Sequence, residues 1–506
     1  MEKLAIINSR ASVGLDAPLV TIEVHLGNGL PAFTLVGLPE ASVREARERV
    51  RSALLTCGFD FPAARITVNL APADLPKEGG RFDVAIAVGI LVASGQLPEH
   101  PLHNLELLGE LALSGEIRHI PGAISAAIAT TAAQHKLVLP EPDASAAARV
   151  ENARIYAPTS LSELVAWLHG QQSLPLIQPH PLPEQSTLQQ VGDLRDVIGQ
   201  NGAKRALLIA AAARHNLLML GPPGTGKTML ASRLAGILPP LTSQQAIDVA
   251  AIYSLSDRER ALNIWQNPPF RSPHHSASAV ALVGGGSKPR PGEISLAHHG
   301  VLFLDEMAEF PRTVLDALRQ PLESGQVHIS RAMSQVSFPA DFQLIGAFNP
   351  SPSGYYQGSQ ARSNVDQILR YLSRLSGPLL DRFDLSVEVT TLPTGSLSQG
   401  PSGQSSKELR QQVYQAHQRQ ISRQGCLNSQ LSGGQLRDIA PLNNPDATFL
   451  EQTISQLGLS IRAYHRIWKV ALTIADLAQQ PLTRAHLVEA LGYRAMDRLL
   501  SRLTRA

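Results

Sequence analysis

The chain has 506 residues, of which 43% are hydrophobic and 17% charged, and its formal net charge is +2 at pH 7. This length is too great for one ordinary core, so about two or three globular domains are expected. The near-neutral charge neither requires nor excludes a nucleic-acid partner, because basic residues can gather locally. The two distant cysteines, Cys57 and Cys426, exclude a disulfide framework and a cysteine-rich metal site.

The chain begins MEKLAIINSRASVG and lacks the basic and then apolar segments of a signal peptide. Its longest apolar runs, such as residues 206–213, are far too short to span a bilayer. Because the paucity of cysteine also fits a reducing compartment, we expect a cytoplasmic protein without a membrane partner.

The first third of the chain mixes strand-like and helical segments. Residues 20–26 (VTIEVHL) and 64–71 (ARITVNLA) alternate apolar and polar side chains, which predicts strands. Residues 41–58 (ASVREARERVRSALLTCG) predict a helix. We expect an N-terminal domain over residues 1–168, followed by a linker over residues 169–190 that is rich in Pro, Gln and Ser.

The middle of the chain alternates apolar strands with helices. Strands are expected in residues 217–221 (LLMLG), 301–306 (VLFLDE) and 343–350 (QLIGAFNP), and a helix is expected from Lys227. This order is typical of the α/β class, with a parallel sheet covered by helices on both faces. We place this central domain at residues 191–390.

The last part of the chain is expected to be helical. Residues 391–406 are rich in Gly, Ser and Pro and predict a flexible linker. Beyond it, the segment SIRAYHRIWKVALTIADLA, residues 460–478, carries apolar residues at helical spacing. We therefore expect an all-helical domain over residues 407–506.

A phosphate-binding loop is predicted by GPPGTGKT, residues 221–228, which follows a strand and opens a helix. This is the pattern G-x-x-x-x-G-K-[ST] in the context that it needs. Its glycines let backbone N–H groups close around phosphate oxygens, and the helix N-terminus adds a favourable dipole. We expect Lys227 to neutralise the β and γ phosphates and Thr228 to hold Mg²⁺; a glycine-rich turn that binds nothing is the alternative.

Polar residues end the next two predicted strands. A buried strand has no structural reason to end in Asp305 and Glu306, because unpaired buried acids are costly. Beside a phosphate loop, Asp305 is expected to orient Mg²⁺ and Glu306 to take a proton from the attacking water. Asn349 is expected to hydrogen-bond that water or the γ phosphate, although an Asn before Pro is often only a turn starter.

The order of these motifs resembles that of AAA+ ATPases, in the branch that holds magnesium chelatase and MCM helicases. That branch has an insertion in the helix after its second strand, which residues 270–286 fit, and a hairpin before its first sensor, which residues 328–338 fit. The chain is similar, over nearly its whole length, to the ComM family, also called YifB. The shared stretches lie at residues 36–54, 69–91, 196–207, 270–278, 291–306, 376–385 and 462–477.

The resemblance implies a fold and a nucleotide site. The fold is α/β, with a Lon-protease-like N-terminal domain, an AAA+ P-loop core with an insert in helix 2, and a C-terminal all-helical lid. Besides the residues of the phosphate loop, two residues of DVIGQNGAKRAL are expected to contact ATP. The full expected ATP-binding set is Val197, Ile198, Gly221, Pro222, Pro223, Gly224, Thr225, Gly226, Lys227 and Thr228.

The segment SGPLLDRFDL, residues 376–385, places Arg382 between Asp381 and Asp384. In related rings this arginine reaches the γ phosphate held by the neighbouring subunit, so the resemblance implies an arginine finger that acts in trans. The alternative is a surface ion pair with either aspartate. Arg462 matches the second sensor arginine and is expected to touch the γ phosphate, either in cis or in trans.

Two segments depart from their relatives. In the Lon-like domain, Arg81 stands where the protease has its nucleophilic serine and Ile124 stands where it has its lysine, so peptidase chemistry is not expected. Many relatives carry cysteine pairs where this chain has Ser351, Ser353, Ala361 and Ser363, and serine is a poor zinc ligand. We expect no structural zinc there and no metal at the adjacent histidines 274–275 or 298–299.

The resemblance is compatible with three kinds of load, that is, three kinds of molecule on which ATP hydrolysis would do work. The first is DNA, gripped in the channel of a homo-hexamer; Arg331, Lys288 and Arg290 are then expected phosphate contacts, with surface salt bridges as the alternative. The second is protein, as in Lon, and the third is metal insertion into a porphyrin, as in chelatase. The resemblance favours DNA, because ComM-like proteins act as branch-migration helicases that integrate single-stranded DNA during natural transformation. A chelatase-like or chaperone-type remodeler is the alternative.

Overall fold

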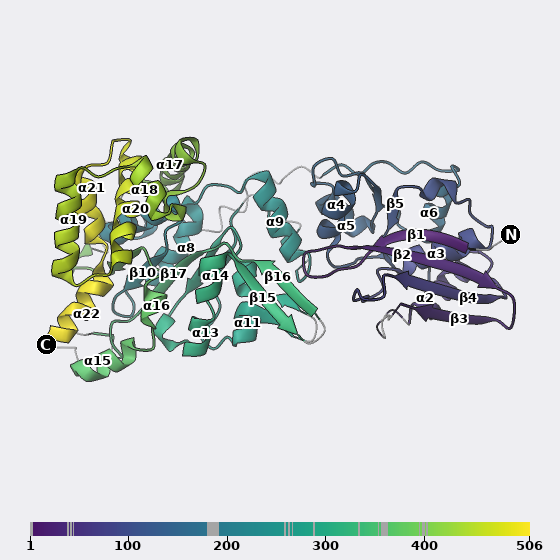
Figure 1. Cartoon of the computed structure of the whole chain (residues 1–506), viewed down its shortest axis with the longest axis horizontal. Coiled ribbons are helices and arrows are strands. Elements are labelled where there is room, and N and C mark those ends of the chain that lie inside the picture. Colours follow the sequence, from purple (N-terminus) through teal and green to yellow (C-terminus); the bar gives the residue numbers. More distant parts are fainter. Residues whose placement is uncertain are drawn as a thin grey trace. The chain divides into compact units, whose positions relative to one another are not determined.

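The computed structural model forms two compact units (Figure 1). The first unit comprises Met1–Leu182, Ser243–Trp265 and Ser330–Phe338, and the second comprises Pro183–Thr242, Gln266–Ile329 and Pro339–Ala506. The structure describes residues 4–37, 40, 43, 45–179, 192–257, 260–261, 264–265, 267–286, 289–331, 334–352, 354–355, 363–393, 395–396, 400 and 403–505. Among the helices of these residues, none has the length and apolarity needed to cross a membrane.

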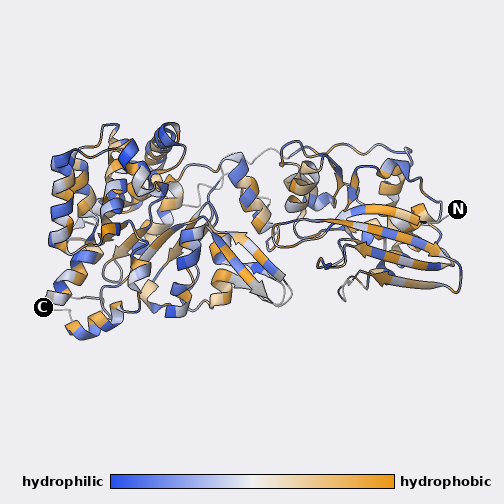
Figure 2. Ribbon diagram, viewed as in Figure 1, coloured by the Kyte–Doolittle hydropathy of each residue, from blue (hydrophilic) through white to orange (hydrophobic). Residues whose placement is uncertain are grey.

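The first unit is built on a seven-stranded mixed sheet with the order β3-β4-β2-β1-β5-β8-β9. Alternate residues of β2, such as Val20, Ile22 and Val24, are fully buried, and Figure 2 shows this alternation along the strand. The predicted period of two is thus confirmed, because one face of the strand packs on the core. The strands are β1 Leu4–Arg10, β2 Leu19–Gly27, β3 Ala32–Val36, β4 Arg65–Ala71, β5 Leu105–Leu107, β8 Lys136–Val138 and β9 Ile155–Tyr156.

Helix α3 is buried along nearly its whole length, because its sequence DVAIAVGILVA is apolar on every side. This unit also contains a small antiparallel pair, β6 Glu110–Leu111 and β7 Ile117–Arg118. Its helices are α2 Ala46–Thr56, α3 Asp83–Ala93, η1 His100–Leu102, α4 Ala123–Ala132, α5 Glu141–Ala147, α6 Leu161–Leu168 and α9 Ser243–Tyr253.

The second unit contains a five-stranded sheet whose pairs are all parallel, in the order β11-β14-β17-β10-β18. The predicted parallel α/β sheet is therefore confirmed. Strands β10, β14 and β17 are buried at every residue, as expected for strands covered on both faces. The strands are β10 Leu217–Leu220, β11 Phe270–Arg271, β14 Val301–Leu304, β17 Gln343–Phe348 and β18 Leu385–Glu388.

The predicted insertion and hairpin also form. The insertion contains α11 Ala279–Val283 and the short strand β12 Gly284–Gly285, which pairs with β13 Arg290–Pro291. Strands β15 Gln326–Arg331 and β16 Ser334–Pro339 form the hairpin sheet. The helices of this part are η3 Leu194–Asp196, α7 Asn201–Ala213, α8 Lys227–Ile237, α12 Glu293–Leu296, η4 Met307–Glu309, α13 Arg312–Asp316, α14 Arg319–Ser324, α15 Val365–Leu372 and α16 Gly377–Leu380.

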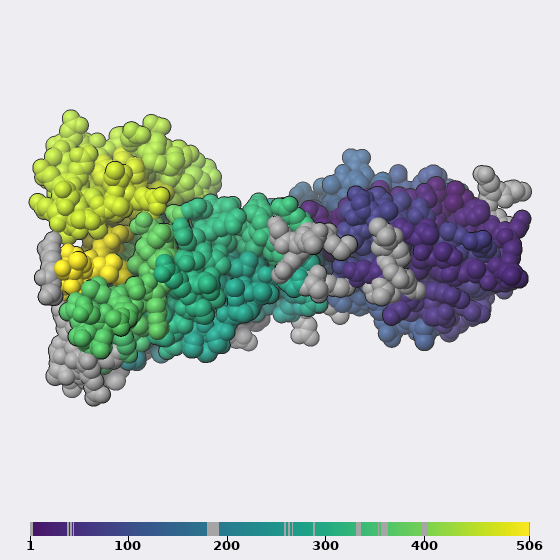
Figure 3. All heavy atoms as spheres, turned by 60° about the horizontal axis from the view of Figure 1, so that its bottom comes forward, coloured from purple at the N-terminus to yellow at the C-terminus, as the bar shows by residue number. Residues whose placement is uncertain are grey.

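The C-terminal region is helical, as predicted, and Figure 3 shows its yellow and yellow-green atoms lying against the green part of the second unit. A buried polar network joins it to the sheet. His215, fully buried, lies with Nε2 2.9 Å from Oγ1 of Thr473 on α20 and Nδ1 3.3 Å from the Asp384 carboxylate before β18. The helices are α17 Ser406–Gln424, η6 Asn428–Gln430, α18 Gly433–Ile439, α19 Asn444–Leu457, α20 Ile461–Ala478, α21 Arg484–Gly492 and α22 Ala495–Arg505.

Candidate nucleotide site

The phosphate loop and the two predicted acids lie at one edge of the second unit's sheet, because the carboxyl ends of parallel strands meet there. The loop follows β10, whose neighbour β17 ends in register with it at Phe348 opposite Leu220. Backbone geometry explains the loop's glycines. Gly224 and Gly226 have φ of +77° and +90°, and a Cβ on Gly221 would lie 2.1 Å from the Val389 carbonyl oxygen.

Lys227 is buried inside the loop that it is predicted to serve. Its Nζ donates hydrogen bonds to the carbonyl oxygens of Gly221 at 2.7 Å and Pro222 at 2.8 Å, and to Oδ1 of Asn349 at 3.1 Å. Burial lowers the pKa of Lys227, and the nearby carboxylates of Asp305 and Glu306 oppose that shift. The structure thus brings together the lysine and the asparagine, which the sequence placed after two separate strands.

Thr228 and Asp305 also meet, as the prediction of a shared Mg²⁺ site requires. The Thr228 hydroxyl donates to Oδ2 of Asp305 at 2.5 Å. A hydroxyl and a carboxylate oxygen are ligands of the hard type that Mg²⁺ prefers, so these residues fit the ion. Glu306 follows with a left-handed backbone, φ +49°, which is unusual for a residue with a side chain. Its carboxylate is more than half exposed.

The segment that carries Val197 and Ile198 reaches the phosphate loop through a residue that the sequence did not single out. Val197 is buried directly after η3. Two positions after Ile198, the side-chain amide of Gln200 donates to the Thr225 carbonyl at 3.4 Å and to the Thr390 carbonyl at 2.7 Å. Only the fold could reveal this contact, because Gln200 matches no phosphate-binding motif.

Arg382 forms an ion pair with Glu323 of α14, rather than with the aspartates beside it in the sequence. Its own backbone is fixed, since its carbonyl accepts a hydrogen bond of 2.9 Å from the side chain of Asn216. Asp384 instead turns inward, where it accepts a hydrogen bond of 3.2 Å from the Asn216 backbone N–H. Neither Glu323 nor Asn216 was predicted from the sequence, because each lies far along the chain from Arg382.

Arg462 lies close to the Arg382 segment, as a shared role requires. Its guanidinium is 3.7 Å from the Asp381 carboxylate, and Arg466, one helical turn later, is 3.6 Å from the same carboxylate. Burial lowers the pKa of Arg382, and the positive charges of Arg462, Arg466 and Arg319 lower it further. Four arginines thus lie near one another, together with the carboxylates of Glu323 and Asp381. Such a group of guanidinium side chains is suited to binding an anion.

The predicted DNA contacts are only partly described. Arg290 is exposed on β13. Arg331 ends β15, and Lys288 lies outside the described residues. These three predictions therefore stay predictions.

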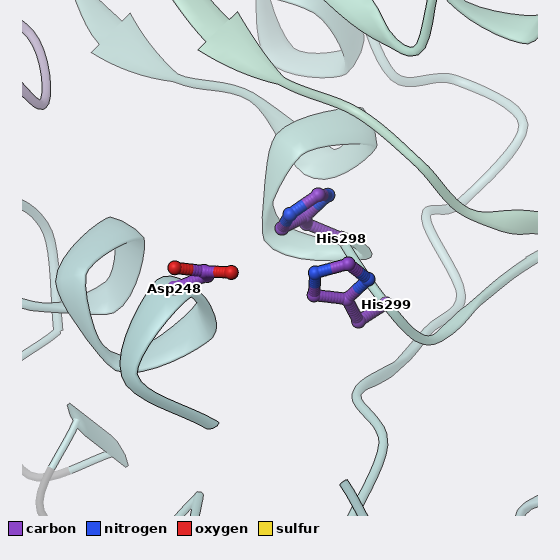
Figure 4. Close-up of side chains that lie close together, drawn as sticks. All are labelled: Asp248, His298 and His299. Carbon is purple, nitrogen blue, oxygen red and sulfur yellow. The ribbon is translucent and has the colours of Figure 1, made fainter. Parts of the chain in front are cut away.

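The histidine pair His298–His299 follows α12, and Figure 4 shows the two rings close together, with centroids 3.8 Å apart. Nδ1 of His298 accepts a hydrogen bond of 3.0 Å from the Asp341 backbone N–H. Burial would raise the pKa of Asp341, but hydrogen bonding to His299 and the charge of Arg214 outweigh burial and lower it. The pair thus has structural partners within the second unit; Asp248, also drawn in Figure 4, belongs to the first unit.

The other positions at which this chain differs from its relatives have local structural roles, as far as they fall within the described residues. Arg81 is buried and donates to the carbonyl oxygens of Arg10 and Pro121. Burial lowers the pKa of Arg81 to about 10. In the serine-rich segment, buried Ser351 donates to the Tyr355 carbonyl at 2.8 Å. The neighbouring positions 353 and 361 lie outside the described residues.

Comparison with known proteins covers most of the chain. The model described as magnesium chelatase, subunit ChlI, matches residues 193–397; that described as subunit ChlI of Mg-chelatase matches residues 22–143; and the subunit ChlI C-terminal model matches residues 403–494. Competence protein ComM of Haemophilus influenzae is 55% identical over 99% of both chains. Protein YifB of Salmonella typhimurium is 54% identical over 99% of both. The magnesium-chelatase 38 kDa subunit of Cereibacter sphaeroides is 27% identical over 38% of this chain and 57% of its own.

Proposed function

The chain belongs to the magnesium-chelatase-like AAA+ family that includes competence protein ComM and YifB, and from that premise we propose that it is an ATP-driven DNA motor. The observation that carries the proposal is the convergence at one sheet edge of Lys227 with Asn349 and of Thr228 with Asp305. Family membership supports Mg²⁺-dependent ATPase activity in the same place.

In the proposed reaction, a water oxygen bonds to the γ phosphorus of ATP while the bond from that phosphorus to the β,γ-bridging oxygen breaks. Glu306 takes one proton from the water and later releases it to solvent, so ADP and phosphate leave in balance. The Lys227 ammonium group gives up its hydrogen bonds to the loop carbonyl oxygens and donates to phosphate oxygens instead. Asn349 orients the attacking water. Thr228 and Asp305 would hold Mg²⁺, which would supply neutralising positive charge to the phosphates when bound.

We propose that Arg382 completes the site of a neighbouring subunit. An arginine supplies the positive charge that the phosphoryl-transfer transition state needs. Within the described part of one chain, Arg382 pairs with Glu323, while Lys227 pairs with Asn349, so the two cationic groups occupy separate clusters. Arg462 and Arg466 lie in the cluster of Arg382. A ring of identical subunits, a homo-hexamer as in related motors, would bring each cluster to the next subunit's phosphate.

DNA is the proposed load, in a cytoplasmic setting, and branch migration during natural transformation is the proposed role. The identity of 55% to a competence protein over 99% of both chains supports this choice. The second candidate is a chelatase-like or chaperone-type remodeler, which similarity to a magnesium-chelatase subunit favours. That similarity is weaker, because it amounts to 27% identity over 38% of the chain.

Stimulation of ATP hydrolysis by DNA separates the two candidates. We expect single-stranded and forked DNA to raise the ATPase rate of the wild-type chain, and the same chain to extend a strand-exchange intermediate. The Glu306→Gln variant should bind ATP but lose about 10²- to 10⁴-fold in turnover, because it lacks the base. An ATPase rate that DNA leaves unchanged, while a folded protein client raises it, would support the remodeler instead.

A further inference from the structure

Asn216 holds the segment that carries Arg382. It lies directly before β10, and its side-chain amide donates to the Arg382 carbonyl at 2.9 Å. Its backbone N–H donates to Oδ2 of Asp384 at 3.2 Å, and its carbonyl accepts from the N–H groups of Asp384 at 2.9 Å and Leu385 at 3.1 Å. All these residues belong to the second unit. One residue therefore fixes the backbone from Arg382 to the start of β18.

The side chain of Asn216 is itself held in one orientation. Its Oδ1 accepts a hydrogen bond of 2.8 Å from the backbone N–H of Leu344 on β17. An N–H group can only donate and a carbonyl oxygen can only accept, so the amide must turn its NH₂ group toward Arg382 and its oxygen toward Leu344. The Asn216 side chain thus joins β17 to the Arg382 segment, and an aspartate of the same shape would serve only one of these two partners.

His215, beside Asn216, brings a second arginine-bearing element to the same place. His215 is fully buried, and its Nε2 lies 2.9 Å from Oγ1 of Thr473 on α20, the helix that carries Arg462. Its Nδ1 lies 3.3 Å from Oδ2 of Asp384, the oxygen that also accepts from the Asn216 N–H. The Arg382 segment and α20 therefore meet at residues 215–216.

The two ends of β10 serve different parts of the proposed mechanism. Its C-terminal end leads into the phosphate loop at Gly221, which is proposed to hold the chain's own ATP. Before its N-terminal end lies Asn216, whose side chain, within the described part of the chain, hydrogen-bonds only to Arg382 and Leu344. Loss of this amide should therefore disturb Arg382 more than the phosphate loop.

We propose that Asn216 is a positioning residue that holds Arg382 in place for the ATP of the neighbouring subunit. The inference rests on the proposed trans action of Arg382 and deepens it by naming the residue that places its guanidinium group. Without the Asn216 amide, the Arg382 carbonyl loses its donor and the backbone there is free to turn. A displacement of about 1 Å far from the reacting atoms can cost about 10²-fold in rate, so this bond should matter to turnover.

The test uses Asn216→Asp, which keeps the acceptor for the Leu344 N–H and places an oxygen against the Arg382 carbonyl. We expect turnover about 10²-fold below wild type, with unchanged affinity for a fluorescent ATP analogue. Asn216→Asp is then mixed either with Lys227→Ala, whose Arg382 is intact, or with Arg382→Ala, whose phosphate loop is intact. Lys227→Ala should restore activity, because its Arg382 completes the pocket of the Asn216→Asp subunit, and Arg382→Ala should not.

Gln343→Ala is the matched control for a general loss of local structure. The amide of Gln343 also holds backbone before β10, since it donates to the carbonyl oxygens of Ala210 at 3.0 Å and His215 at 2.7 Å. Any activity that Gln343→Ala loses should show no preference between the two mixing partners. A second variant, Asn216→Ala, removes the amide without adding a charge and should show the same selective recovery as Asn216→Asp. Thermal melting shows which of the two Asn216 variants is folded, and that variant decides the test.

Three outcomes would overturn the inference: turnover of the folded Asn216 variant close to wild type, recovery with Arg382→Ala, or recovery with neither partner. The mixture of Arg382→Ala with Lys227→Ala, measured alongside, tests the trans action itself. Absence of recovery in that mixture would overturn the trans action and this inference with it. Recovery there, without the selective pattern for the Asn216 variants, would overturn the inference alone.

Discussion

Replacing Thr228 by Ala tests the metal-binding half of the nucleotide site. The hydroxyl of Thr228 donates to the Asp305 carboxylate at 2.5 Å, and the variant removes this oxygen while leaving the loop backbone in place. The Thr228 oxygen would be a ligand of the bound ion, and its loss should cost about as much as a hydrogen bond to a charged group, about 1.5–3 kcal/mol, in the lower half of that range because this pair is exposed. We therefore expect the Mg²⁺ concentration needed for half-maximal ATPase activity to rise about 10- to 30-fold.

The matched control is Thr225→Ala in the same loop. Its hydroxyl donates to the Pro222 carbonyl at 2.9 Å, a contact internal to the loop. ATPase rates are titrated with Mg²⁺ at fixed ATP for wild type, Thr228→Ala, Thr228→Ser and Thr225→Ala. Thr228→Ser should stay within about three-fold of wild type, since it keeps the hydroxyl. An unchanged Mg²⁺ requirement in Thr228→Ala, or an equal shift in Thr225→Ala, would refute the assignment of this hydroxyl.

Three further outcomes are expected. Arg382→Ala should retain ATP binding but lose about 10³-fold or more in turnover, and mixing it with Lys227→Ala should restore activity if Arg382 acts in trans; no recovery would argue for action in cis. Arg290→Ala should weaken DNA binding for every sequence and reduce the salt slope of the affinity by about 1, whereas an unchanged slope would remove it from the interface. Burial lowers the pKa of His417 to about 4, and its Nε2 lies 3.0 Å from the Ala211 carbonyl oxygen. Between about pH 6.5 and pH 4, His417 is therefore protonated in the unfolded chain and neutral in the folded chain. Chemical denaturation should show stability flat above about pH 6.5 and falling below it toward about pH 4, by up to about 1.4 kcal/mol per pH unit, with a weaker fall in His417→Gln.

The order of elements in the second unit could be predicted from the sequence because its signals are local. A strand followed by GPPGTGKT requires glycine at positions of positive φ or close backbone approach, and Gly221, Gly224 and Gly226 meet those requirements. Buried apolar runs predicted the parallel strands, and apolar residues at helical spacing predicted α20. The meeting of Lys227 with Asn349 follows from the neighbouring of β10 and β17 in the sheet, which only the structure shows.

The pairings between distant residues were decided only by the tertiary structure. Nothing near Arg382 in the sequence indicates Glu323, and nothing near Glu306 indicates His275, for which the sequence analysis predicted only that it binds no metal. Such contacts depend on how loops from different strands pack, which local patterns do not encode. The chain's motifs thus predict its chemistry, phosphate binding and water activation beside an apolar parallel sheet, because their signals lie in residues that are neighbours in the sequence. The fold decided which distant side chains contact the motif residues, because those contacts form only when segments far apart in the chain are brought together.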